Sequence, residues 1–441
     1  MSPPIPNTLL EPRWLLPMDP DGALLHAHAV VLEGDRIAAV LPVAEAHAAY
    51  PAAVRVPLPT HALLPGLINL HTHAAMALLR GVADDLPLRA WLEDHIWPAE
   101  ARHVSASFVE DGTLVAAAEM LRGGTTCFHD MYFFPEAAAR AARRAGIRAI
   151  LGLVVVEFPT SHARNAADYL ARAREAHAAL ASNGLVCCGI APHAPYTVSD
   201  ATFTAAVALA DELDVPLHVH VHETEHEIEE SLQLHGRRPL ARLDALGAVS
   251  SRLVAAHCVH LTPAERDLLA QRGAAVAHCP ASNLKLASGF APIADLAGRG
   301  VTVGIGTDGA AANNRLDLWS EMRLAALVGK AVAGRADALP AHTVLAMATR
   351  NAARALGIDH AVGSIVPGKA ADLVAVDLGA PELQPCFDPA SHLVYAAGRE
   401  HVTHVWVAGR PVVENGRLLT VDVDEVAALA REWGGRIAAE A

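Results

Sequence analysis

The middle of the chain alternates strand-like and helix-like segments in a regular order. Apolar segments typical of β-strands alternate with alanine- and leucine-rich segments that have helical spacing, such as EAAARAARRA and ATFTAAVALADEL. The eight strand-like segments are 62–73, 125–132, 148–156, 186–196, 216–224, 252–261, 274–283 and 301–309. Eight strands alternating with helices predict a TIM (β/α)8 barrel of the α/β class. A doubly wound sheet is the alternative, but no GxGxxG motif follows the first strand.

The two ends of the chain have a different pattern. Residues 23–59 and 371–419 contain short valine- and isoleucine-rich runs broken by turn sequences, which is typical of β-hairpins. We expect residues 1–60 and 371–441 to pair into one small composite β-sandwich domain. The catalytic barrel would then span residues 61–370.

Composition restricts the class of protein. Hydrophobic residues make up 52% of the chain, enough for a large core, and the formal net charge of −14 opposes non-specific binding to nucleic acid. The six cysteines form no CxxC pair, and we see neither a signal sequence nor an apolar run that could span a bilayer. We therefore expect a soluble cytoplasmic protein with a small-molecule partner, no nucleic acid and no membrane. The sequence leaves open whether it forms a homo-oligomer.

Histidines and acids gather where the strands are expected to end, the face on which barrel enzymes place their active sites. The first strand ends in His71 and His73. Residues i and i+2 of a strand point to the same side, so both imidazoles can face one metal ion. The pattern alone is weak, because the same spacing occurs at His26 and His28 in the N-terminal flank.

The later strands add further donors. Glu223 follows the fifth strand, His257 lies on the sixth, and Asp308 ends the eighth between two glycines. Each alone is more simply a satisfied polar residue or an ordinary turn, but jointly these nitrogen and oxygen donors suit zinc. The fifth strand offers three candidate ligands that strand parity does not separate: His218, His220 and His222.

Several longer motifs carry a family resemblance. They are LLPGLINLHTH (63–73), LLRGVADDLPLRAWLEDHIWPAE (78–100), APHAPY (191–196), HVHET (220–224), AAHCVHL (255–261), HCPASNLKLASGFAPI (278–293), GTDGAAANN (306–314) and VPGKAADLVAVD (366–377). With them the chain resembles the amidohydrolase superfamily, in particular its branch of methylthioadenosine/S-adenosylhomocysteine deaminases and triazine hydrolases. The resemblance covers nearly the whole chain. It implies a barrel with a composite β-sandwich and zinc-dependent hydrolytic deamination of an adenine-type nucleoside.

The resemblance also implies roles for single residues. The metal ligands would be His71, His73, His220 and Asp308, where the HVHET motif selects His220. Glu223 would be the acid–base carboxylate.

The same motifs assign three more positions. His257 matches the histidine that hydrogen-bonds the attacking water, while Glu100 and His193 match substrate-contacting positions. In the implied mechanism Asp308 accepts a proton from the water and Glu223 protonates N1 of the purine. Glu100 would accept hydrogen bonds from the ribose hydroxyls, and His193 would contact the sugar or the base.

The scarcity of lysine bears on the number of metal ions. Binuclear relatives bridge two metals with a carboxylated lysine at the end of the fourth strand. Here that strand ends in His193, and the only lysines are Lys285, Lys330 and Lys369. We therefore expect one Zn²⁺ per chain.

The third strand bears on the group that the substrate carries at its 5′ carbon. The end of this strand is apolar, Glu157 comes next, and the first arginine after it is Arg164. A buried carboxylate needs a cationic partner, so these residues favour a methylthio group over an amino-acid tail. We expect methylthioadenosine to be the better substrate and S-adenosylhomocysteine the poorer.

Other interpretations remain at this point. Within the same chemistry, the alternative is a triazine or guanine-type hydrolase with the same mononuclear site. From a different class, the chain could be a catalytically inactive barrel scaffold, although every ligand position is filled. Cys258 and Cys279 are expected in the core, and Trp91 and Trp97 either anchor the loop after the first strand or line the pocket.

Overall fold

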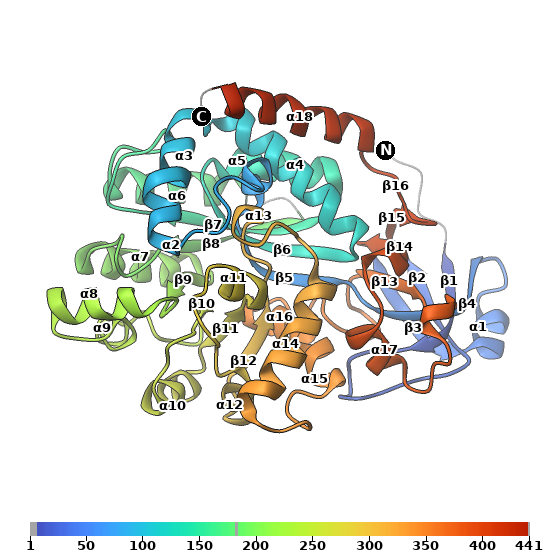
Figure 1. The fold of residues 1–441 in the computed structure, drawn as a ribbon. Helices are drawn as coiled ribbons and strands as arrows, with labels where there is room; N and C mark the ends of the chain where they lie inside the picture. Colours follow the sequence, from blue (N-terminus) through green and yellow to red (C-terminus); the bar gives the residue numbers. More distant parts are fainter. Residues whose placement is uncertain (1–6, 181–183, 440–441) are drawn as a thin grey trace.

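The computed structural model describes residues 7–180 and 184–439, and within them the strands form two eight-stranded sheets (Figure 1). The sheet in the middle of the chain is parallel, and its strands follow one another in chain order. Its strands are β5 (Leu67–Thr72), β6 (Thr125–Tyr132), β7 (Arg148–Val155), β8 (Val186–Pro192), β9 (Leu217–Val221), β10 (Leu253–His257), β11 (Ala275–His278) and β12 (Thr302–Ile305). Each of the eight strand segments expected from the sequence contains one of them.

The first and last strands of this sheet meet and close it into a barrel. The backbone N–H of Asp308, just after β12, donates to the carbonyl of His71 on β5 at 2.9 Å. Two residues earlier on β5, the Asn69 side chain donates to Oγ1 of Thr307 at 2.7 Å. The predicted TIM barrel is therefore confirmed.

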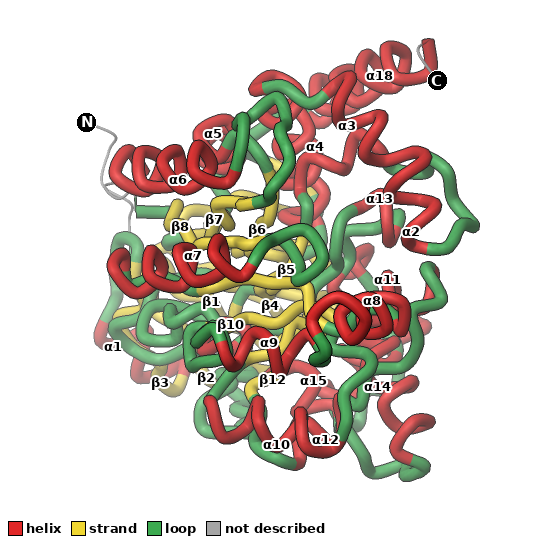
Figure 2. The backbone as a smooth tube through the Cα atoms, turned by 90° about the vertical axis from the view of Figure 1, so that its left-hand side faces the viewer, coloured by secondary structure: helices red, strands yellow, loops and turns green. Residues whose placement is uncertain are grey.

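Helices surround the barrel strands, as Figure 2 shows. They are α4 (Ala106–Arg122), α5 (Pro135–Ala145), α6 (Ala166–Leu180), α7 (Asp200–Leu213), α8 (Glu225–His235), α9 (Pro239–Ala245), α10 (Pro263–Arg272), α11 (Pro280–Lys285), α12 (Ile293–Gly298), α13 (Ala310–Asn313), α14 (Leu318–Ala333), α15 (Ala341–Met347) and α16 (Arg350–Ala355). Polar residues begin several of them in the way the sequence favours. Ser105 accepts from the N–H of Phe108 at the start of α4, and Thr262 forms a capping box with Glu265 at the start of α10.

The connection between β5 and α4 is long and itself partly helical. It contains η1 (Ala74–Leu79), α2 (Leu88–Ala90), η2 (Trp91–Ile96) and α3 (Trp97–His103). Trp91 anchors this segment through a 3.3 Å hydrogen bond from its Nε1 to the carbonyl of Val82.

The second sheet combines both ends of the chain. The strand order of this sheet is β16-β15-β14-β13-β4-β1-β2-β3. Strands β1 and β4 pair in parallel, and all other neighbouring strands of the sheet pair antiparallel. The elements here are β1 (Thr8–Leu15), β2 (His28–Glu33), β3 (Arg36–Pro42), α1 (Val43–Ala49), β4 (Val54–Pro65), β13 (Leu373–Asp377), η3 (Pro381–Leu383), α17 (Pro389–Tyr395), η4 (Arg399–His401), β14 (Val402–Val407), β15 (Arg410–Glu414) and β16 (Arg417–Leu418). Leu32 on β2 and Trp406 on β14 share one apolar cluster, so strands from both ends of the chain enclose a common core.

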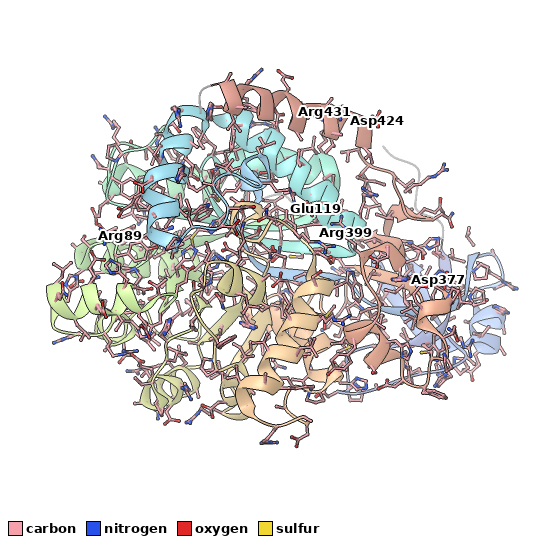
Figure 3. All side chains as sticks on the ribbon, viewed as in Figure 1. Arg89, Glu119, Asp377, Arg399, Asp424 and Arg431 are labelled. Carbon is pink, nitrogen blue, oxygen red and sulfur yellow. The ribbon has the colours of Figure 1, made fainter. Side chains whose placement is uncertain are left out.

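We propose the domain division expected from the sequence, residues 1–60 with 371–441 and residues 61–370, because the second sheet draws on both ends. Residues 1–6, 181–183 and 440–441 of that division lie outside the described residues. The two parts are tied together by an ion pair of 3.1 Å between Arg399, just before β14, and Glu119 on α4 (Figure 3).

The C-terminal helix α18 (Val423–Ala439) lies across α4 of the barrel (Figure 1). The Trp433 ring packs edge-on against Phe108 with 5.2 Å between ring centroids, and its Nε1 donates to Asp111 at 2.9 Å. In the part of the chain that the structure describes, no helix has the length and apolar character needed to cross a membrane.

Candidate metal centre and substrate cavity

Four histidines and one aspartate converge at the carboxyl ends of the barrel strands. Two overlapping groups within residues 7–180 and 184–439 bring three donor atoms each within 4.8 Å of one another: His71 with His220 and His257, and His71 with His73 and Asp308. Oδ1 of Asp308 lies 3.4 Å from Nε2 of His71 and 3.2 Å from Nε2 of His73. The four candidate ligands expected from the sequence therefore meet at one point of the barrel mouth.

The free ring nitrogens of this cluster suit a metal ion. Nδ1 of His73 is hydrogen-bonded to the carbonyl of Met131 at 2.7 Å, and Nδ1 of His220 to the carbonyl of His193 at 2.8 Å. Each ring must therefore carry its proton on Nδ1 and turn Nε2 towards the cluster. Nε2 of His71 is fully buried and has no hydrogen-bond partner among the described residues. Three imidazole nitrogens and a carboxylate oxygen fit the donor set of a mononuclear zinc site.

Asp308 reaches this position through an unusual backbone conformation. Its φ is +60°, a left-handed value that a non-glycine residue adopts only where the surroundings hold it. Gly306, which flanks it, instead allows the end of β12 to lie close to β5, because a Cβ on Gly306 would lie 2.8 Å from the backbone N of His71. The left-handed residue is therefore the aspartate itself and not either of the glycines that flank it.

The three histidines of β9 have three different environments. His220 faces the cluster, and its ring centroid lies 4.9 Å from that of His71. His218 lies deeper in the barrel, where its Nε2 is 3.0 Å from Nδ1 of His71. His222 comes after the strand with φ of +55° and turns away, and its Nε2 accepts from the backbone N–H of Leu240 at 3.0 Å.

Glu223 and His257 lie beside the metal-binding cluster. Oε2 of Glu223 is 3.8 Å from Nε2 of His257, and both side chains are buried. Burial raises the pKa of Glu223, and the negative charge of Asp308 adds to this effect. The carboxylate of Glu227 on α8 accepts from the backbone N–H groups of His222 and Glu223 at 2.9 and 3.0 Å, which holds this turn in place.

A cavity of about 330 Å³ opens directly onto this cluster. Its walls are largely apolar, and Trp91 and Trp97 both line it. The polar side chains that reach it are His73, Glu100, Thr160, Ser161, His193, Tyr196, His220, Glu223, His257 and Asp308. An apolar cleft with a few convergent polar groups is the usual form of a small-molecule site.

Glu100 on α3 and His193 just after β8 are both held by neighbouring side chains. The hydroxyl of Tyr132 donates to Oε1 of Glu100 at 2.6 Å. Burial raises the pKa of Glu100 to about 6, although this hydrogen bond opposes the rise. Nδ1 of His193 lies 2.9 Å from Oγ1 of Thr197, and burial together with the neighbouring histidines lowers the pKa of His193 to about 3.

A second cavity of about 950 Å³ adjoins the first and shares Leu88, Leu92, Trp97, Phe158, Tyr196 and Leu286 with it. Acidic side chains dominate its charged lining: Glu93, Glu157, Glu225, Glu227 and Glu230, against Arg89 and Arg242. Arg89, on α2 at the outer rim, is already paired with Glu93 at 2.9 Å (Figure 3). Arg242 is buried and bonded to the carbonyls of Pro195 and Val198.

Several contacts in the site were not expected from the sequence. They involve His218, Tyr132, Glu227, Ser282 and Asn283. The hints in the sequence were uneven: His218 and Glu227 lie near the HVHET motif, Ser282 and Asn283 lie in the HCPASN motif, and Tyr132 lies in no motif. Cys258 and Cys279 are buried, as expected for core residues.

Comparison with known proteins agrees with this architecture. The chain is 45% identical over 434 residues to a 5-methylthioadenosine/S-adenosylhomocysteine deaminase of Teredinibacter turnerae, with 98% of each chain covered. A crystal structure of an adenosine deaminase from Xanthomonas campestris with bound zinc is 50% identical, with a TM-score of 0.97 over 99% of this chain and 100% of that one. An atrazine chlorohydrolase from Arthrobacter aurescens, complexed with zinc, is 25% identical, with a TM-score of 0.90 over 97% and 99% of the two chains. Residues 62–412 match the amidohydrolase family, which spans the whole barrel. The chain therefore belongs to the amidohydrolase family.

Proposed function

We propose that the protein is a zinc-dependent deaminase that replaces the 6-amino group of an adenine-type nucleoside with oxygen and releases ammonia. The observation that carries this proposal is that the metal-binding cluster opens, beside Glu223 and His257, onto a cavity that the carboxylate of Glu100 also lines. The deaminases among the relatives support the same reaction class.

One zinc ion would be held by His71, His73, His220 and Asp308. Bound there, zinc lowers the pKa of a water molecule from about 16 to about 7, which makes a nucleophile available at neutral pH. Asp308 would accept a proton from that water, since its Oδ1 lies beside the Nε2 atoms of His71 and His73, at 3.4 and 3.2 Å. The overlap of the two donor groups at His71 and the absence of lysine before position 285 favour one ion over two.

Glu223 supplies the proton that the purine needs. Attack of water oxygen on C6 moves an electron pair onto N1, so an acid must protonate N1 as the new bond forms. The raised pKa of Glu223 favours the protonated form that can donate. His257, whose Nε2 lies 3.8 Å from Oε2 of Glu223, accepts a hydrogen bond from the attacking water and orients it. Asp308 then gives the proton it took from the water to the amino nitrogen and ammonia leaves. The proton of the oxygen at C6 returns to Glu223 as the carbonyl of an inosine-type product forms.

A substrate panel tests the proposed function. The zinc-loaded chain should release ammonia from adenosine and methylthioadenosine, and each product should have the absorption spectrum of hypoxanthine. Guanine, cytosine and an amino-triazine serve as the other members of the panel. Faster turnover of guanine or the triazine would favour the alternative within the same chemistry, and no ammonia from any member would favour an inactive scaffold.

Ribose recognition by Glu100 separates a nucleoside deaminase from a triazine hydrolase, because a triazine has no diol. Glu100→Ala should lower kcat/KM on adenosine by about 10- to 100-fold, since a hydrogen bond to a charged group contributes about 1.5–3 kcal/mol. The rate on free adenine should change little. Asp94→Ala is the matched control, because Asp94 is exposed on the same segment. Equal losses on nucleoside and free base would assign Glu100 to structure.

The apolar wall of the first cavity favours methylthioadenosine over S-adenosylhomocysteine. Val154, Val156 and Phe158 line it, and none of its described lining residues is an arginine or lysine. Arg164 is 86% exposed and paired with Asp168, while the arginines of the second cavity are already bonded. A buried carboxylate without a partner costs several kcal/mol, so kcat/KM should favour methylthioadenosine by about 10²-fold or more, with adenosine between.

Two arginine variants check this preference. Arg89→Gln and Arg164→Gln should leave the ratio of kcat/KM for the two thioethers unchanged. Comparable kcat/KM values for both thioethers would overturn the preference, and a selective loss on S-adenosylhomocysteine in either variant would identify the arginine responsible.

We place the enzyme in the cytoplasm, which the six free cysteines support.

A further inference from the structure

The short helix α11 carries two adjacent buried polar residues next to the metal-binding cluster. Ser282 is 0% and Asn283 2% exposed, and neither lines either of the two cavities. Both belong to the HCPASN motif at residues 278–283. A side chain that is excluded from the cavity can act on the reaction only through the groups it contacts.

Ser282 fixes the rotation of the Asp308 carboxylate. Its hydroxyl donates to Oδ2 of Asp308 at 2.7 Å. The other oxygen, Oδ1, accepts from the backbone N–H of Gly309 at 2.7 Å and faces His71 on β5 and His73 just after it. With one donor on each oxygen, the carboxylate cannot turn, and the same oxygen always points at the metal-binding cluster.

Asn283 fixes the protonation pattern of the His257 ring. Its Oδ1 is 2.8 Å from Nδ1 of His257, and an amide oxygen can only accept. The proton of a neutral His257 ring must therefore lie on Nδ1. Nε2, which faces Glu223, is left as the atom that meets the attacking oxygen.

The helix that carries both residues is itself tied to the end of β12. Oε2 of Glu321 accepts from the backbone N–H of Ala281 at 3.0 Å, and its Oε1 accepts from the side-chain amide of Asn313 at 2.8 Å. The same amide donates to the carbonyl of Thr307 at 2.6 Å. One buried carboxylate on α14 thus connects α11 to the residue that precedes Asp308, so the distance between Ser282 and Asp308 is set by the fold.

We propose that Ser282 and Asn283 form a positioning pair for the deamination, in which Ser282 orients the metal-binding oxygen of Asp308 and Asn283 sets the tautomer of His257. The catalytic effect of this pair depends on the proposed function, whereas its effect on metal binding does not. Partners that orient metal ligands typically contribute 10- to 100-fold in metal affinity or activity.

Ser282→Ala tests the first half without any substrate. The variant should bind zinc about 10- to 100-fold more weakly than the wild type in competition with a chelator. Ser282→Thr, which keeps the hydroxyl, should restore most of that affinity. Ser288→Ala is the matched control, since Ser288 is also buried after α11 but its Oγ has no hydrogen-bond partner among the described residues. Equal zinc affinity in wild type and Ser282→Ala would overturn the role of Ser282.

Asn283→Leu tests the second half through a separation of kinetic constants. The variant should keep its zinc and its KM but lose about 10- to 100-fold in kcat, because the side chain touches His257 and not the cavity. Asn283→Asp, which still accepts from Nδ1, should recover most of kcat. An Asp variant as slow as the Leu variant, or a loss confined to KM, would overturn the role of Asn283.

Two further measurements keep the tests separate from folding and from the proposed function. Thermal unfolding of every variant shows whether it folds; if Asn283→Leu does not, Asn283→Ala replaces it in the same comparison. If the wild type deaminates nothing in the substrate panel, the proposed function fails, while the zinc competition still decides whether Ser282 orients Asp308.

Discussion

Replacing His71 or Asp308 with alanine should reduce deamination to the uncatalysed background, a loss of more than about 10⁴-fold, while the chain stays folded. The reason is that each residue supplies a donor atom to the same small cluster, and without the metal the water keeps its ordinary pKa near about 16. Metal analysis of the wild type should give about one zinc per chain, and of either variant close to none. Ammonia release and thermal unfolding, measured on the same preparations, separate loss of metal from loss of fold.

The appropriate control is a histidine of the same spacing outside the cluster. His26→Ala changes an exposed residue just before β2 of the second sheet, and the variant should keep both zinc and activity. Two zinc ions per chain in the wild type, or normal turnover in His71→Ala, would contradict a single catalytic metal at this place.

The parts of this molecule that the sequence predicted well are those encoded by local pattern. Apolar segments of strand length between helical segments predicted the barrel, and a barrel requires its strand ends to meet at one face. Residues at the ends of strands far apart in the chain, such as His71 and Asp308, are therefore expected together from the pattern alone. The second sheet was predicted in the same way from hairpin patterns at both ends.

Strand periodicity alone did not distinguish the three histidines of β9. It places His218, His220 and His222 on one side, but only the first two remain on the strand. His222 lies beyond the end of β9 with positive φ and turns towards the loop that carries Leu240. Where a strand stops depends on tertiary packing, so the choice of His220 needed either the family resemblance or the structure.

The contacts that hold the site together were beyond sequence reasoning for a related reason. Tyr132 with Glu100, and Ser282 with Asp308, join different loops of the barrel mouth, and no local pattern encodes such pairs. The left-handed backbone of Asp308 was equally beyond sequence reasoning, because a positive φ is more typical of glycine, which flanks Asp308 on both sides. Such features become visible only when the loops are placed side by side.

Glu223→Gln should keep the zinc and lower kcat by about 10²- to 10⁴-fold, the range that general acid–base transfer usually contributes. Glutamine has the same size and can still donate a hydrogen bond to N1, so binding of substrate should change little. It cannot give up a proton, and the electron pair that moves onto N1 during attack at C6 is then not neutralised. Because the change leaves the metal-binding cluster intact, the loss should appear in kcat with KM and zinc content close to those of the wild type.

The pH dependence gives this prediction a second and sharper form. Burial raises the pKa of Glu223, so the wild type should lose activity as pH rises through that pKa and the carboxyl group gives up its proton. In Glu223→Gln that particular decline should disappear, since the amide does not titrate in this range. Glu229→Gln, an exposed change on the neighbouring helix α8, should preserve both the rate and the decline. Near wild-type kcat in Glu223→Gln would mean that another group protonates N1 and that Glu223 is not the acid of this site.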